Sequence, residues 1–534
     1  MDKTKTIDIP SLLNSLHTRR EFLTLFGKGL GYTALAATLP ACGGGGGDDT
    51  EPPAPVDQIP VASKEYTTLK RTSFGVHRDE LETINNMGID AYLEQQLDHL
   101  SINDGNLENS LKSLFPLAFH TPTQLYAGFP ENITDTYHDV ISATQYRQIF
   151  SKRQLYEVMV EFWSDHFNIH LLNGLGPTLK PTDDLQVIRA NALGNFQNLL
   201  QASASSPSML FYLDNFFNQA SAPNENYARE LMELHTLGVD GGYTETDIKE
   251  VARCFTGWSI RFPNDPNGNY GDFIFNPLIH DNDEKTILGN TIAAGGGQTD
   301  GTQVLNILAT HPSTAQFIAR KLCIRFISDQ PDQSTIDTVA QAFITSNGEI
   351  IDTLRALFST NAFRNTSDQK LCRPSEYLAG MIRALAPDTD YPSDTGALFI
   401  LAQSILGQLP FNWATPDGYP DTQSYWENTG GLLNRWRLSF LSYSSVGTIP
   451  IIDVFQIDYS AMLNGADTLL TMVDALSDRI LMRPLADKDR ELLLDWLTTE
   501  TGQSDSTPLP AVTVDQLTPL IAAVLLSSAY YQLR

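Results

Sequence analysis

The sequence predicts an all-α protein, a large and irregular multi-helix domain with long loops and little β-structure. Apolar residues recur at intervals of three and four over most of the chain, whereas the strict alternation that marks half-buried strands is rare. No segment recurs at a fixed period, so a solenoid of repeats is not expected. The chain has 534 residues and is 42% hydrophobic, enough to build a large core.

The N-terminal segment is expected to be a signal peptide. Arg19 and Arg20 precede a weakly apolar stretch, 26–39, that is too short to span a bilayer. The paired arginines resemble a twin-arginine export signal, which a receptor reads. An ordinary core helix is disfavoured because five glycines, 43–47, follow almost at once. Residues 1–41 are therefore predicted to be removed.

Leu39-Pro40-Ala41-Cys42 resembles a lipobox, in which Cys42 becomes the acylated first residue of the mature chain. Several acyl chains on one cysteine would anchor the protein stably in a membrane. Residues 43–60 are rich in Gly, Asp and Pro and cannot bury a core, so 42–62 is predicted to be a lipidated cysteine with a flexible tether. The alternative is an ordinary cleavage site. The expected location is the periplasmic or cell-surface side of a membrane.

The mature chain that would remain, 42–534, is strongly acidic. Removing the five basic and three acidic residues of 1–41 leaves 30 basic and 60 acidic residues, a formal charge of −30. Such a field repels phosphate backbones, so nucleic acid is not an expected partner. Cys254, Cys323 and Cys372 are far apart and form no CxxC pair, which leaves at most one disulfide and no zinc knuckle.

Helices are expected wherever apolar residues follow the helical period. If the domain divides into two lobes, the loop-rich stretch 265–300 is the expected boundary. The predicted helical segments are 136–170, 183–204, 226–238, 244–258, 302–327, 333–344, 374–385, 432–443, 461–481, 488–499 and 514–529.

Some acidic and histidine side chains are predicted to point inward. On the helix 226–238, Glu230 falls between Leu234 and Leu237 on the apolar arc, and Glu233 lies at its edge. Arg229 lies within reach of Glu233, four residues along the helix. A buried carboxylate must be paired, protonated or bound to a cation.

Three further segments supply similar groups. On the helix 244–258, Asp247 is expected among apolar residues, and Thr244 with Asp247 also resembles a capping box. His166 lies on the same helical face as Trp163 and Phe167. His280 and Asp281 are adjacent in a loop.

The functional hypothesis is that these groups converge on a metal or acid–base site. Glu230, Glu233 and Asp247 would be catalytic, and His166, His280 and Asp281 would bind a divalent metal such as zinc, iron or manganese. The structural alternative, a buried ion-pair network with Arg229 or Arg253 as partners, is favoured over it. The absence of HExxH, of a GxSxG elbow and of a Walker loop excludes the common motif-based assignments.

The stretch 224–258, NENYARELMELHTLGVDGGYTETDIKEVARCFTGW, resembles the signature of the bacterial family called domain of unknown function 1800. FWSDHF (162–167), LGQLPFNWATPDGYP (406–420) and LLSSAYYQLR (525–534) resemble other landmarks of that family, in the same order. The resemblance covers 63–534 and implies one family-wide domain. It implies no catalytic residue, because the activity of the family is not established.

Two hypotheses about function follow. The first is a metal-dependent enzyme, a hydrolase or an oxidoreductase, and a twin-arginine signal fits it because that route carries folded proteins with their cofactors. The second is a non-enzymatic surface protein that binds a partner protein or a glycan. The enzyme is slightly favoured.

Overall fold

The computed structural model describes residues 59–385, 396–441 and 457–534. Within these ranges the chain is mainly helical, which confirms the predicted class. The β-structure described there is limited to two small antiparallel hairpins and isolated bridges. One hairpin pairs β1 (Trp258–Ile260) with β2 (Phe273–Phe275), and the other pairs β3 (Lys285–Ile287) with β4 (Asn290–Ile292).

The α-helices of the described ranges are α4 (Lys64–Thr72), α5 (Arg78–Met87), α6 (Ile89–Leu97), α7 (Gly105–Leu114), α8 (Pro122–Tyr126), α9 (Ile133–Phe150), α10 (Gln154–His166), α11 (Gly176–Asp183), α12 (Phe196–Ala204), α13 (Pro207–Tyr212), α14 (Asn226–Glu230), α15 (Glu245–Cys254), α16 (Gln298–Ala309), α17 (Pro312–Phe326), α18 (Gln333–Thr345), α19 (Ile350–Phe358), α20 (Asn361–Asn365), α21 (Pro374–Leu385), α22 (Gly396–Leu406), α23 (Gln423–Trp426), α24 (Thr429–Leu441), α26 (Tyr459–Met462), α27 (Leu469–Leu476), α28 (Asp487–Thr501), α29 (Ala511–Ser527) and α30 (Ala529–Gln532). Wider π-helical turns continue three of them, at Asp184–Arg189, Leu231–Thr236 and Ser477–Leu481.

In the structure, some of the predicted helices are divided into two shorter helices. The predicted helix 136–170 is α9 and α10, because Ser151 turns away from the helix and its hydroxyl bonds to Asp104. The predicted helix 302–327 is α16 and α17, which begins at Pro312. Proline lacks the N–H group that a continuous helix would use there, so a new helix starts instead.

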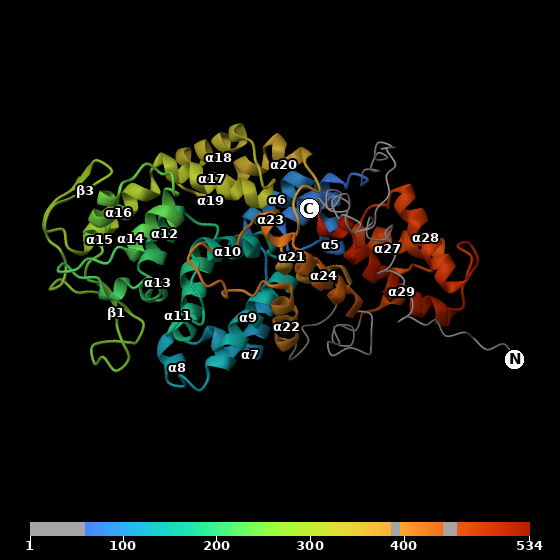
Figure 1. Ribbon diagram of the computed structural model, residues 1–534, viewed down its shortest axis with the longest axis horizontal. Coiled ribbons are helices and arrows are strands. Elements are labelled where there is room, and N and C mark those ends of the chain that lie inside the picture. The colour runs from blue at the N-terminus through green and yellow to red at the C-terminus, as the bar shows by residue number, and fades with distance from the viewer. Residues whose placement is uncertain (1–58, 386–395, 442–456) are drawn as a thin grey trace, which may run out of the picture.

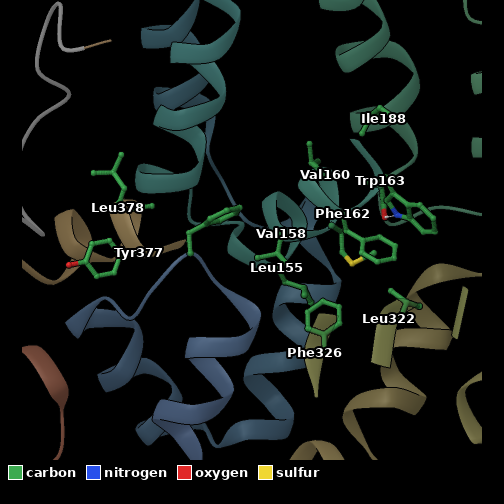
Figure 2. Close-up of a cluster of buried hydrophobic side chains, with 14 of the residues drawn as sticks. Leu155, Val158, Val160, Phe162, Trp163, Ile188, Leu322, Phe326, Tyr377 and Leu378 are labelled. Carbon is green, nitrogen blue, oxygen red and sulfur yellow. Dashed lines mark hydrogen bonds between the residues drawn. The ribbon is translucent and has the colours of Figure 1, made fainter. Parts of the chain in front are cut away.

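A single large cluster of buried apolar side chains extends from Phe74 to Tyr531. Figure 2 shows its middle, where side chains of α10 lie between α17, which contributes Leu322 and Phe326, and α21, which contributes Tyr377 and Leu378. In Figure 1, α10 and α21 lie near the centre of an elongated molecule and α17 lies above them. Burial of so many apolar groups is the main force that holds them together.

The two hairpins lie at one end of the molecule and α27 to α29 lie at the other (Figure 1). Residues 265–300 are therefore at an end and do not separate two lobes, contrary to the expected boundary.

The predicted signal residues Arg19 and Arg20, the predicted lipidation site Cys42 and the first part of the tether lie outside the described residues. In the part of the chain that the structure describes, no helix combines the length and the apolar character needed to cross a membrane.

Candidate functional site

A polar cleft of about 210 Å³ opens beside the C-terminal end of α10. Segments far apart in the sequence line it: α10, α17, the residue before α21 and the loop that leads to α23. Its walls contain Phe162, Asp165, Lys321, Ile324, Arg373, Asp417, Tyr419, Pro420, Asp421 and Thr422. Phe162 and Asp165 are held on α10, and Lys321 and Ile324 on α17, whereas residues 417–422 belong to a loop.

Lys321 of α17 is the cation with the most unusual surroundings in this cleft. Its Nζ lies 3.0 Å from Nδ1 of His166, and the rings of Phe317 and Phe162 lie 5.6 and 6.0 Å from it. Aromatic rings and a neutral imidazole solvate an ammonium group less well than water does. Burial therefore lowers the pKa of Lys321 to about 8.

Three carboxylates act on Lys321 from a greater distance. Asp165, Asp421 and Asp417 each favour its charged form, but in the described ranges no acid group lies within 4.0 Å of its Nζ. The attraction falls with distance, so it does not offset the loss of hydration. Lys321 therefore stays partly neutral near pH 8 in a cleft that water can enter.

His166 is a fixed hydrogen-bond acceptor for Lys321. Its Nε2 lies 3.0 Å from the backbone carbonyl oxygen of His235, so Nε2 carries the proton and donates it. Nδ1, which faces Lys321, is then the acceptor. Burial and the nearby Lys321 hold the pKa of His166 well below its usual value, and the pKa of His235 is lowered to about 3. Both imidazoles are neutral at physiological pH.

Two carboxylates share one guanidinium at the side of the cleft. Arg373 lies 2.5 Å from Asp165 and 3.5 Å from Glu161. Burial raises the pKa of both acids, and a single arginine cannot compensate two negative charges. One of the two carboxyl groups therefore retains a proton to higher pH than an exposed aspartate would.

A second ion-pair cluster, centred on Glu376, lies in the core next to the Arg373 cluster. Glu376 of α21 lies 2.6 Å from Arg325 and 3.0 Å from Arg534. Burial alone would raise the pKa of Glu376, but the two arginines lower it below its usual value. This acid is charged and structural.

The cleft thus holds a base and an acid whose pKa values are shifted toward each other. The pKa of Lys321 is lowered and that of Asp165 is raised. Pairs of titratable groups whose surroundings move their pKa values in this way are typical of general acid–base catalysis. Structural ion pairs also shift pKa values, but here both groups line an open cleft.

Of the predicted site residues, His166 contacts Lys321 directly. Burial raises the pKa of Glu230, and Glu233 and Asp417 add to the effect. Glu230 is half-buried and is not among the residues that line the cleft. Glu233 pairs with Arg229 at 3.5 Å, as the structural alternative predicted.

His280 and Asp281 belong to a separate ion-pair network near the hairpins. Nε2 of His280 lies 3.2 Å from Asp300, and Asp281 pairs with Arg253 at 2.7 Å. Lys285 also pairs with Asp300, at 2.7 Å. This arrangement is the buried network of the structural alternative, with Arg253 as the partner.

Asp247 caps a helix. Its carboxylate accepts hydrogen bonds from the backbone N–H and hydroxyl of Thr244 and from the backbone N–H of Leu288. The predicted capping box is confirmed, and the inward direction predicted for Asp247 is wrong. The first turn of α15 places this side chain toward its own N-terminus because the unpaired N–H groups there attract it.

The six predicted residues therefore do not meet at one point. Among the described residues, no group of three or more His, Cys, Asp or Glu side chains is arranged to hold a metal ion. The donor set proposed for zinc, iron or manganese does not fit a single ion here. The three described cysteines are free and buried, and burial raises the pKa of each thiol.

A protein with this fold and this cleft is a helical scaffold with a polar site at its centre. The chain belongs to the family described as protein of unknown function DUF1800, whose family model matches residues 67–533. Comparisons with curated proteins and with solved structures find no match.

The stretches that carry the family resemblance gather around the cleft. Asp165 and His166 come from FWSDHF, and Asp417 and Tyr419 come from the segment 406–420. Lys321, Asp165, Arg373 and Asp417 are functional candidates that sequence reasoning missed. For Asp165 and Asp417 the signal was present, because both lie within landmark stretches.

Proposed function

We propose that the protein is an exported, lipid-anchored enzyme, a hydrolase that uses acid–base chemistry in the Lys321 cleft. The observation that carries this proposal is the lowered pKa of Lys321, about 8, in an open polar cleft with a protonatable acid beside it. Maintaining a desolvated ammonium group lowers stability, and such costs are common at functional sites.

The proposed reaction needs two proton transfers. Neutral Lys321 accepts a proton from a water molecule, whose oxygen attacks the bond to be cleaved. The ammonium group formed on Lys321 then donates this proton to the departing group, which leaves Lys321 neutral for the next cycle. His166 is a positioning residue, since its Nδ1 fixes the direction of Nζ.

Replacement of the base is expected to abolish turnover. Lys321→Met should lower the rate of hydrolysis by about 10²–10⁴-fold, the usual contribution of a general base. The measurement is a screen of the full chain, purified in detergent, against chromogenic esters, amides, phosphoesters and glycosides, followed by kinetics on any substrate found. With the wild type, the rate should rise with pH through about 8 as Lys321 loses its proton.

Arg320→Met is the matched control, because Arg320 is the exposed neighbour of Lys321 on α17 and donates a hydrogen bond to Gln333 at 2.9 Å, away from the cleft lining. It should retain full activity. Equal activity of wild type and Lys321→Met would contradict the proposed base. Absence of turnover on all substrate classes would favour the alternative, a non-enzymatic protein that binds a partner protein or glycan.

Elemental analysis of protein purified without added metal separates two forms of the enzyme hypothesis. Stoichiometric zinc, iron or manganese would favour a metal-dependent enzyme over chemistry by side chains alone. The structure supports the second form, because the described acids and histidines are dispersed over separate networks.

The proposed anchor rests on Cys42 and on the Arg19-Arg20 pair. Cys42→Ala is expected to move the protein from the membrane fraction to the soluble exported fraction, because no acyl chain can then be attached. Immunoblots of the fractions measure this. Retention of Cys42→Ala in the membrane would contradict lipid anchoring through this residue.

A further inference from the structure

The amino group of Lys321 is enclosed by aromatic rings from two neighbouring helices. On α17, Phe317 lies four residues before Lys321 and therefore on the same face of the helix. On α10, Phe162 precedes His166 by the same interval. The centroid of the His166 ring lies 6.2 Å from that of Phe317 and 6.4 Å from that of Phe162. Three rings thus surround one amine at the wall of the cleft.

Two backbone contacts fix these rings. Gly238, at φ +82°, packs so closely on Phe317 that a Cβ atom there would lie 2.9 Å from Cδ2 of the ring. The carbonyl oxygen of His235 holds Nε2 of His166. The amine therefore has a defined position before any ligand binds, which lowers the entropic cost of a reaction at this atom.

In its neutral form, Lys321 directs a lone pair away from His166. One N–H group of Lys321 is donated to Nδ1 of His166 at 3.0 Å. Lys321 lines the cleft and His166 does not, so the lone pair lies on the side of the cleft. In the described ranges, no carboxylate within 4.0 Å of Nζ holds the ammonium form. A desolvated lysine amine of this kind is a nucleophile toward carbonyl carbon atoms.

We propose that Lys321 reversibly captures a small, uncharged aldehyde or ketone as an iminium ion. Nζ attacks the carbonyl carbon, so that a C–N bond forms and the π-electron pair passes to the oxygen. The oxygen takes one proton from the nitrogen and one from solvent, the C–O bond breaks, and water leaves. The nitrogen keeps its other proton, which remains directed toward Nδ1 of His166. No oxidant or reductant is consumed.

The other groups of the cleft favour an uncharged, hydroxylated ligand. Arg373 is already paired with Asp165, whereas Asp417 is exposed. This exposed carboxylate and the net negative charge of the chain repel anionic carbonyl compounds. Oδ1 of Asp417 accepts hydrogen bonds from Nε1 of Trp413 and the hydroxyl of Thr415. Within the described part of the chain, Oδ2 is left to accept a bond from a ligand hydroxyl.

The size of the cleft also limits the ligand. Its volume of about 210 Å³ lies below the roughly 300–1,000 Å³ of pockets for drug-sized molecules. A small hydroxy-aldehyde satisfies both the size and the polarity of the walls. Its capture uses the same neutral lysine as the proposed hydrolase but does not depend on hydrolysis.

Reductive trapping of the full chain in detergent tests this capture. The protein is incubated at neutral pH with glycolaldehyde and cyanoborohydride, which reduces an iminium ion to a stable amine, and the adducts are located by peptide mass spectrometry. Lys321 should be labelled roughly tenfold faster than Lys249, an exposed lysine of α15, because more of its amine is neutral. Pyruvate, an anionic carbonyl compound of similar size, should label Lys321 more slowly than glycolaldehyde.

Two controls separate the folded environment from the reagent. In denaturing urea, Lys321 and Lys249 should be labelled at equal rates, because unfolding restores the hydration of Lys321. Lys321→Arg keeps the positive charge but removes the amine, so its peptide should carry no adduct. Equal labelling of the two lysines in the folded protein would overturn the capture. Pyruvate labelling as fast as that by glycolaldehyde would overturn the preference for an uncharged ligand.

The outcome is distinguishable from that of the hydrolase test. Selective labelling of Lys321 in a protein without hydrolytic turnover would refute the hydrolase and leave the capture standing. Turnover that requires Lys321, without selective labelling, would support the general base and refute the capture.

Discussion

Glu376→Ala is expected to lower the free energy of unfolding by about 3–5 kcal/mol, the usual cost of removing one member of a buried ion pair. The substitution leaves Arg325 and Arg534, both at most 2% exposed, without their nearest carboxylate. Glu376 also accepts a hydrogen bond from the backbone N–H of Arg373 at 2.7 Å, so the start of α21 loses a contact. Urea denaturation followed by circular dichroism measures the loss.

An exposed ion pair provides the control for this prediction. Glu94 and Arg355 lie 2.7 Å apart but have side chains about half exposed, 52% and 45%. Glu94→Ala should cost less than about 1 kcal/mol, because water screens such a pair. Similar losses for Glu376→Ala and Glu94→Ala would show that the central cluster is not a rigid support for the cleft.

The same glutamate gives a pH dependence of definite sign. The pKa of Glu376 is lower in the folded protein than its usual value of 4.5. Its contribution to stability is therefore present above pH 4.5 and is lost as the pH falls through the folded-state pKa. The difference in stability between wild type and Glu376→Gln should decrease on acidification.

The free energy of unfolding of wild type is expected to increase relative to that of Lys321→Met as the pH rises. The pKa of Lys321 is about 8 in the folded protein, whereas the usual pKa of an exposed lysine is 10.5. Between these values the unfolded chain binds more protons, so this group increases stability as the pH rises. From about pH 7 to about pH 10, wild type should gain roughly 2–3 kcal/mol relative to Lys321→Met.

Paired urea titrations at about pH 7 and about pH 10, the two ends of the range over which this lysine changes charge, measure the difference, with Arg320→Met as the reference variant. Other lysines and tyrosines titrate equally in both proteins and cancel. At the lower pH, Lys321→Met removes a desolvated charge but leaves Nδ1 of His166 without its donor, which costs about 1–3 kcal/mol. A relative stability that stays constant over the pH range would mean that Lys321 is solvated like a surface lysine. The proposal that Lys321 is the general base would then fail.

The sequence predicted secondary structure better than it predicted side-chain convergence. Helical periodicity located α18 and α21 almost to the residue, since the period depends only on local spacing. It merged α9 with α10 because Ser151 ends the first helix through a hydroxyl bond to Asp104, 47 residues away in the sequence. Such a contact leaves no local signal.

The same limit applies to the candidate site. Glu230 and His166 were predicted to face inward from helical spacing. Glu230 is half-buried, and His166 is buried and contacts Lys321 of the cleft. Asp247 was misplaced because the open N–H groups at the start of α15 attract its carboxylate more strongly than the apolar face does. Lys321 was not predicted, since its lowered pKa depends on desolvation by Phe162 and Phe317 and on a neutral His166.

By itself the sequence determined the helical class of the protein and its membership of one family over nearly the whole described domain. It could do so because helix formation and family motifs depend on short stretches of neighbouring residues. Only the tertiary structure decided which charges are compensated: Glu376 is paired, Lys321 is desolvated, and Arg435 is buried without a carboxylate partner in the described ranges. The physical reason is that hydration and electrostatic interaction depend on distances through space, which the order of residues does not reveal.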